Sequence, residues 1–266
     1  MNIQYITSSS NQKLKYIRSL EKRKVRRDEG LYIAEGASVV EDSVKHGASI
    51  TEVYAAKSAL DKYSSIIERV SASGIPVYSV SDHIMASLTP AKAPQGIFAV
   101  IKQQSKQFDA DSLRDGGLVV ALDALSDPGN MGTIIRTADA VGADAMIVGP
   151  GCVDVYNEKV VRASMGSLSS IRIFISEDLS MAVMEMKKHG WVAACGHLAG
   201  TDFFQRDYYG KTMLIIGNEA HGVSEQVADV CDYKWKLPML GKAESLNAAV
   251  AAGILMYELA IKKAQC

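Results

Sequence analysis

Three glycine-bearing turns in the second half of the chain carry polar side chains that could bind ligands or take part in catalysis. The first begins with Asp-Pro-Gly, a strong turn signal, and continues with Asn130, whose side chain can cap the following helix. Arg136 lies in that helix, off its predicted core face and near the end of the preceding strand. Because open α/β sheets bind ligands at the carboxyl ends of their strands, both residues are candidates for function. A capped helix with a surface arginine is the purely structural alternative.

The second turn follows an apolar strand that ends at Ile216 and Gly217, and it continues with Asn218 and Glu219 before Gly222. Glycines at a strand exit let backbone N–H and C=O groups approach a ligand closely. The turn lacks the G-K-[ST] of a Walker loop and the G-x-G-x-x-G spacing of a dinucleotide-binding turn. Alone, it indicates only a possible ligand site.

The third turn leads from Leu237 through a loop to Ser245, Leu246 and Asn247, which open an alanine-rich helix. Small side chains along this helix permit close approach by another backbone. The structural alternative is a tightly packed terminal helix with Ser245 as a simple cap.

The elements that must position these turns alternate regularly. Apolar runs predict buried strands at 118–125, 145–149, 171–175, 191–196 and 213–217. Helical patterns lie between and after them, near 130–141, 157–169, 178–189, 222–230 and 245–263. Such alternation is typical of an α/β fold with a mostly parallel sheet.

The first hundred residues also alternate. Caps at 8–11 predict a helix running to about Arg27, and further helices are expected at 37–47, 57–74 and 81–88. Strands are expected at 31–36, 50–56, 75–80 and 94–102. The segment 103–117 is polar and charged, which favours a linker. The expected organisation is therefore a domain at 1–102, a linker at 103–117 and a domain at 118–266.

A cluster of cations near the N-terminus suggests a polyanionic partner, although the net charge of the chain is only −1. Clustered lysines and arginines neutralise phosphates and release counterions. A solvated helix face is the alternative. The residues predicted to bind this polyanion are Lys13, Lys15, Arg18, Lys22, Arg23, Arg26 and Arg27.

Composition excludes several classes of protein. The chain is 48% hydrophobic and 22% charged, as in average globular proteins. No apolar run is long enough to predict a membrane span, and the N-terminus has no signal-peptide pattern, so a cytoplasmic location is expected. The four cysteines are widely separated, which predicts neither a zinc site nor a disulfide framework.

Taken together, the three turns resemble the signature motifs of the SpoU or TrmH family of RNA ribose methyltransferases. The matching patterns are N-x-G-x-I-x-R-x-A-x-A-x-G from Asn130, I-G-N-E-x-x-G from Ile216 and L-P-M-x-G-x-x-x-S-L-N from Leu237. The segment VVRASMGS at 160–167 also resembles a family segment between the first two motifs. The match covers 118–263, and 1–102 is more loosely similar to the family's substrate-binding domain, which resembles a ribosomal RNA-binding protein.

The resemblance implies an α/β methyltransferase domain with a trefoil knot, forming a homodimer, and a smaller N-terminal α/β RNA-binding domain. It implies S-adenosyl-L-methionine as cofactor and no metal. By this resemblance the cofactor is expected at Gly217, Leu237 and Leu246, with Ile216, Asn218 and Gly196 on neighbouring turns. The expected catalytic residues are Arg136, Asn130, Glu219, Ser245 and Asn247.

The expected reaction is methyl transfer to a ribose 2′-hydroxyl of structured RNA. Arg136 has the central role in the family. A guanidinium stays protonated at ordinary pH, so we expect Arg136 to fix a phosphate and stabilise an emerging alkoxide rather than to act as a base. Which group accepts the proton stays open.

Alternative functions are a catalytically silent RNA-binding protein on the same scaffold and a nicotinamide-dependent oxidoreductase, although the dinucleotide fingerprint is missing. Ribosomal RNA is favoured over transfer RNA as substrate, because the extra N-terminal domain resembles members that act on ribosomal RNA. Whether the role is housekeeping or antibiotic resistance stays open.

Overall fold

A computed structural model describes residues 3–89, 95–205 and 210–265 of the chain. The contacts divide the chain into two compact units. The first comprises Met1–Gln103 and Asp154–Ser170, and the second comprises Gln104–Val153 and Ile171–Cys266. A segment from the second half of the chain therefore folds with the N-terminal half.

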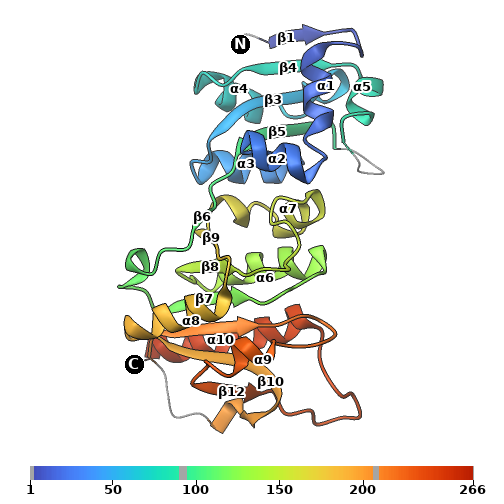
Figure 1. Cartoon of the computed structure of the whole chain (residues 1–266). Helices are drawn as coiled ribbons and strands as arrows, with labels where there is room; N and C mark the ends of the chain where they lie inside the picture. Colours follow the sequence, from blue (N-terminus) through green and yellow to red (C-terminus); the bar gives the residue numbers. More distant parts are fainter. Residues whose placement is uncertain (1–2, 90–94, 206–209, 266) are drawn as a thin grey trace. The chain divides into compact units, whose positions relative to one another are not determined.

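The first unit contains a five-stranded mixed sheet (Figure 1). Its strands follow the order β1 (Ile3–Ile6), β4 (Val77–Val80), β3 (Ile50–Ala56), β5 (Ile97–Lys102) and β2 (Leu31–Glu35). β1, β4 and β3 run parallel, whereas β5 is antiparallel to both of its neighbours. The helices that follow the strands are α3 (Ala37–Lys45), η1 (Lys57–Ala59), α4 (Ser64–Ala72) and α5 (Asp82–Ala86).

The basic run near the N-terminus forms two helices, α1 (Gln12–Ser19) and α2 (Arg23–Glu29). The prediction of one helix reaching about Arg27 is therefore wrong. Asn11 caps α1, since its side chain accepts a hydrogen bond of 2.9 Å from the backbone N–H two residues further on. The helix ends where Leu20 is buried in the core, a tertiary contact that overrides the local helical pattern.

The segment from the second half of the chain completes the first unit. It contains α7 (Glu158–Ser164) and the short helix η3 (Ser167–Ser169). The ring of Tyr156 packs on Tyr32, with centroids 4.8 Å apart. The hydroxyl groups of Ser43 and Ser169 are hydrogen-bonded at 3.1 Å. Both contacts tie this segment to β2 and α3.

The second unit is built on a seven-stranded sheet in which every neighbouring pair is parallel, as predicted for an α/β fold. The order is β12 (Tyr233–Lys236), β10 (Val192–Asp202), β11 (Thr212–Ile216), β7 (Leu118–Leu122), β8 (Ala145–Val148), β9 (Ile173–Ile175) and β6 (Lys106–Gln107). The segment 103–117, expected to be a linker, contributes β6 and η2 (Asp111–Leu113).

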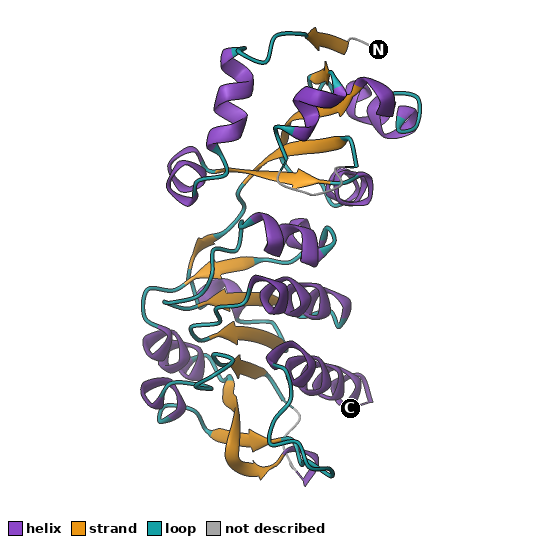
Figure 2. Cartoon of the chain, turned by 90° about the vertical axis from the view of Figure 1, so that its right-hand side faces the viewer, coloured by secondary structure: helices purple, strands orange, loops and turns teal. Residues whose placement is uncertain are grey.

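Helices cover both faces of this sheet (Figure 2). On one face α6 (Pro128–Ala140) packs beside α10 (Ala248–Gln265). On the other, α8 (Leu179–Lys188) and α9 (Glu225–Ala228) bury apolar side chains against β7, β8, β10 and β11. The short helix η4 (Phe203–Gln205) follows β10. Because the central strands are parallel, their carboxyl ends meet at one edge, where the three glycine-bearing turns lie. No helix in the described part of the chain is long and apolar enough to cross a membrane.

Candidate active site

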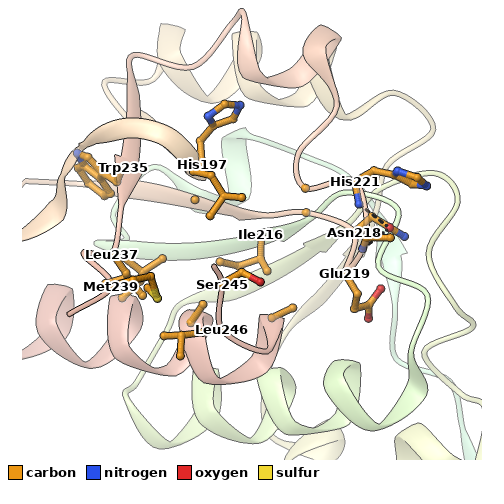
Figure 3. A pocket seen from close by; sticks show the side chains of 18 residues that line it. His197, Ile216, Asn218, Glu219, His221, Trp235, Leu237, Met239, Ser245 and Leu246 are labelled. Carbon is orange, nitrogen blue, oxygen red and sulfur yellow. Dashed lines mark hydrogen bonds between the residues drawn. The ribbon is translucent and has the colours of Figure 1, made fainter. Parts of the chain in front are cut away.

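A cavity of about 340 Å³ lies near the ends of β10, β11 and β12, beside the loop that leads into α10. Figure 3 shows Trp235, Leu237 and Met239 on one side of it and Asn218 and Glu219 on the opposite side. The cavity therefore combines an apolar wall with a polar end. All the residues expected to hold the cofactor line it, namely Gly196, Ile216, Gly217, Asn218, Leu237 and Leu246.

Gly217 is the point where two backbone segments touch. A β-carbon at this position would lie 2.1 Å from the carbonyl carbon of Gly222 and 2.2 Å from the nitrogen of Val223. Asn218 and Gly222 exchange two backbone hydrogen bonds of 2.9 Å just beyond it. Only glycine fits at position 217, and its bare backbone borders the cavity.

Glu219 is the centre of a hydrogen-bond network at the polar end. Its carboxylate accepts bonds from the N–H and hydroxyl of Ser126 at 3.1 and 2.8 Å, the N–H of Asp127 at 3.0 Å and the side-chain amide of Asn130 at 3.0 Å. Partial burial pushes the pKa of Glu219 up, but the hydrogen bonds outweigh it and lower the pKa to about 2. The carboxylate is therefore ionised and saturated with donors, which fixes the start of α6.

Asn247 extends this network to the third motif. Its side-chain amide donates to Oδ1 of Asn130 at 2.9 Å. Its own Oδ1 accepts from the N–H groups of Ala249 and Val250, at 2.9 and 3.2 Å, so it also caps α10. Three catalytic candidates from three motifs are thus connected in the order Asn247, Asn130, Glu219.

The side chain of Asn218 stabilises the loop after β7. Both its amide nitrogen and its amide oxygen are hydrogen-bonded to the protein. Its amide donates to the carbonyl of Ala124 at 2.9 Å, and its Oδ1 accepts from the N–H groups of Ala220 and His221 at 2.9 and 3.2 Å. Ala124 has a φ of 52°, a left-handed conformation that is unfavourable for residues with a β-carbon. The clamp from Asn218 stabilises this strained residue beside the site.

Two further candidates differ in their surroundings. Ser245 lines the cavity and is exposed. Arg136 is exposed on α6 but is not among the residues lining the cavity. Within 3–89, 95–205 and 210–265, its guanidinium forms no hydrogen bond or ion pair. It is therefore available to bind an anion from outside.

The predicted RNA-binding residues fall into two groups. Lys13 is paired with Glu52 at 2.7 Å, and Arg18 donates to a backbone oxygen and to the hydroxyl of Ser87. Arg26 is only 6% exposed, so we leave it out of the proposed RNA surface. The exposed cations of the run are Lys15, Lys22, Arg23 and Arg27, together with Lys24, which was not among the predicted residues.

Some residues of the site were not predicted. Ser126 contributes two hydrogen bonds to Glu219, and its place directly before the Asp-Pro-Gly turn was the only available signal. His197, Leu198 and Leu255 line the cavity without any motif to mark them, and Met239 lies in the third motif but was not singled out.

The cavity fits S-adenosylmethionine, the cofactor implied by the resemblance. Its volume is in the range of small-molecule sites, about 300–1,000 Å³. Leu237, Leu246 and Ile216 offer apolar contacts to an adenine ring, and the close backbone at Gly217 offers N–H and C=O groups. Among the residues that the structure describes, no group of His, Cys, Asp or Glu is arranged to hold a metal ion.

Comparison with known proteins identifies both parts of the chain. Residues 117–257 match the SpoU rRNA methylase family, and residues 11–99 match the MRM3-like substrate binding domain. A 23S rRNA (guanosine(2553)-2′-O)-methyltransferase, RlmP, from Bacillus subtilis is 34% identical over 96% of this chain and 98% of its own length. A 23S rRNA (uridine(2479)-2′-O)-methyltransferase from Streptomyces viridochromogenes is 33% identical over 90% of this chain and 85% of its own length.

Comparison with solved structures leads to the same family. The AdoMet-bound rRNA methyltransferase from Sinorhizobium meliloti has a TM-score of 0.86 at 31% identity, covering 98% of each chain. The SpoU methyltransferase AviRb from Streptomyces viridochromogenes, in complex with AdoMet, has a TM-score of 0.83 at 30% identity, covering 96% of this chain and 98% of that one. The matches extend over almost the whole chain and include its three motifs, so the chain belongs to the SpoU rRNA methylase family.

Proposed function

We propose that this chain transfers a methyl group from S-adenosylmethionine to the 2′-hydroxyl of a ribose in ribosomal RNA. The observation that carries the proposal is the convergence of the second and third motifs on one cavity. The first motif is joined to both of them by the hydrogen bonds from Asn247 to Asn130 and from Asn130 to Glu219. Relatives named for 2′-O-methylation of 23S rRNA match the chain over 96% and 90% of its length, which favours ribosomal over transfer RNA.

The cofactor, when bound, supplies a methyl group on a positively charged sulfur, so the methyl needs no further activation. The protein must align the ribose hydroxyl and stabilise charge on its oxygen. Glu219 holds the start of α6 through its saturated carboxylate, and this positions Asn130. Arg136 stays protonated, and we assign it to binding an RNA phosphate and stabilising the developing oxygen anion.

Homodimerisation through the second unit is part of the proposal. Exposed apolar side chains recur at helical spacing along α10 and the turn before it, namely Leu246, Val250, Ile254, Tyr257 and Ile261. An exposed stripe of this kind is typical of a helix that packs against a partner, and a two-fold dimer pairs the stripe with itself. Leu246 also lines the cavity, so the interface would border the cofactor site. Arg136, on the adjacent α6, would stand near that interface.

The first unit is proposed to grip the RNA. Its exposed cations are suited to phosphates, and structured RNA is recognised by shape and backbone as well as by bases. Ribosomal RNA is made and modified in the cytoplasm of bacteria, and we place the reaction there.

The test is transfer of labelled methyl from S-adenosylmethionine to total RNA that lacks the modification, comparing the unaltered protein with Arg136→Ala. Incorporation of label into ribosomal RNA by the unaltered protein, but not by the Arg136→Ala variant, supports the proposal. Absence of label together with absence of cofactor binding by calorimetry would contradict it and favour a silent RNA-binding protein.

A further inference from the structure

The segment Asp154–Ser170 contains the sequence VVRASMGS, to which the proposed reaction assigns no task, and it folds with the first unit. It carries the label α7 in Figure 1. We propose that this segment is a second RNA-binding element, whose outer face contacts the RNA backbone through Lys159 and Arg162. The inference rests on the proposed function and names a part of the substrate-binding surface that lies outside the N-terminal basic run.

Packing of the segment uses one side of α7. Val160, Val161 and Ser164 are buried, at 0%, 2% and 0% exposure. Lys159 and Arg162 are exposed, three residues apart, and therefore share the opposite side of the helix. Neither cation contributes to the core of the unit.

Both cations are available for an anion. In the three described stretches of the chain, neither side chain forms a hydrogen bond or an ion pair. Burial raises the pKa of the nearby Glu35, and the charge of Arg162 partly offsets this. An arginine and a lysine without bonded partners on a substrate-binding unit match the phosphates of RNA, which attract cations at any sequence.

Met165 adds an exposed apolar side chain at the end of the helix. It ends α7 in a left-handed conformation, with φ of 49°, and its side chain is 44% exposed. The following Gly166 has a φ of 92° and sits against Asp42, where a β-carbon would lie 2.7 Å from that side chain. The turn thus anchors the segment on α3 and leaves the flexible thioether of Met165 exposed, suited to packing on an exposed base or sugar.

The buried arginine of the basic run joins this element to the N-terminal cations. Arg26 forms an ion pair with Asp154, with side chains 7% and 17% exposed, and Nε also donates to Asp154 at 3.1 Å. Its Nη1 donates to the carbonyls of Leu20 and Glu21 at 2.9 and 2.6 Å. This pair ties the start of the segment to α2, so α2 and α7, which both carry exposed cations, are held together in the first unit.

The experiment measures binding of an unmodified transcript of 23S ribosomal RNA at several salt concentrations. The test variant is Lys159→Ala with Arg162→Ala. The control, Lys188→Ala with Arg114→Ala, removes the same two charges from exposed ion pairs in the second unit. We expect roughly tenfold weaker binding for the test variant and a salt slope lower by about one to two, with the control unchanged. Thermal melts and calorimetry with S-adenosylmethionine are the controls for intact folding and an intact cofactor site in both variants.

An affinity and salt slope equal to those of the control would overturn the inference while leaving the proposed function in place. Failure of the unaltered protein to bind the transcript at all would instead contradict the proposed function. The charge-conserving variant Lys159→Arg with Arg162→Lys is expected to bind nearly as well as the unaltered protein, and tenfold weaker binding by it would contradict a contact made through charge.

Discussion

Asn247 donates a hydrogen bond of 2.9 Å to Asn130, and this bond joins the start of α10 to the start of α6, 117 residues earlier in the chain. The same side chain caps α10 through its oxygen atom. Capping and site assembly are therefore two separable tasks of one residue.

A substitution can separate these tasks. Asn247→Ser keeps a capping oxygen but is too short to reach Asn130. We expect its free energy of unfolding to change by less than about 1 kcal/mol, while methyl transfer falls roughly tenfold. Asn247→Ala should lose a further ~1 kcal/mol of stability. Denaturant melts and single-turnover methyl transfer measure the two effects, and unchanged transfer in Asn247→Ser would refute the positioning role.

Glu219 predicts a pH dependence of stability. Its pKa is lowered from 4.5 to about 2 in the folded chain, because its hydrogen bonds outweigh partial burial. A carboxyl group with a lowered pKa stabilises the fold above its unfolded pKa and loses this contribution as the pH falls through the folded value. The gap in melting temperature between the unaltered protein and Glu219→Gln should therefore be constant above about pH 5 and narrow towards pH 2. A gap that widens on acidification would contradict the network.

Gly217 predicts a steric requirement in the cofactor site. Gly217→Ala places a β-carbon 2.1 Å from the backbone of Gly222, so the turn must open. We expect loss of S-adenosylmethionine binding by calorimetry and a destabilisation of about 1–3 kcal/mol. Gly241→Ala is the control, because no atom lies within 4 Å of its added carbon. Cofactor binding by Gly217→Ala with unchanged affinity would show that the turn is not the cradle.

The apolar stripe on α10 predicts an oligomeric state. Ile254→Lys puts a charge in the middle of the stripe, where the native residue is 38% exposed. We expect the unaltered protein to sediment as a dimer and the variant as a monomer. Met181→Lys, on the exposed face of α8, is the matched control and should remain a dimer. A dimeric Ile254→Lys protein would place the interface elsewhere.

The sequence was sufficient for the parallel sheet and for the second and third motifs, which supply most of the cavity lining, whereas His197, Leu198 and Leu255 carried no signal. It missed β12, since Tyr233–Lys236 is short, polar at two of its four positions and followed two residues later by Pro238. It also missed Ser126, because its hydroxyl can donate to Glu219 only once the fold brings the first and second glycine-bearing turns together. The trefoil knot implied by the resemblance stays a prediction.

The charge run near the N-terminus shows that a local sequence pattern cannot predict which cations are buried in ion pairs. Arg26 looks like its neighbours in sequence, yet its partner Asp154 lies 128 residues away. The break between α1 and α2 has the same kind of cause, since burial of Leu20 is set by the whole unit. Long-range pairing of this sort leaves no trace in residue spacing.

The chemical position of the transferred methyl decides whether this protein is a ribose 2′-O-methyltransferase. RNA labelled by this protein is hydrolysed in alkali, which cleaves after every ribose with a free 2′-hydroxyl. We expect the label to be recovered in alkali-resistant dinucleotides and Arg136→Ala to abolish this product. Label recovered only in mononucleotides would mean that the methyl is on a base, and it would contradict 2′-O-methylation.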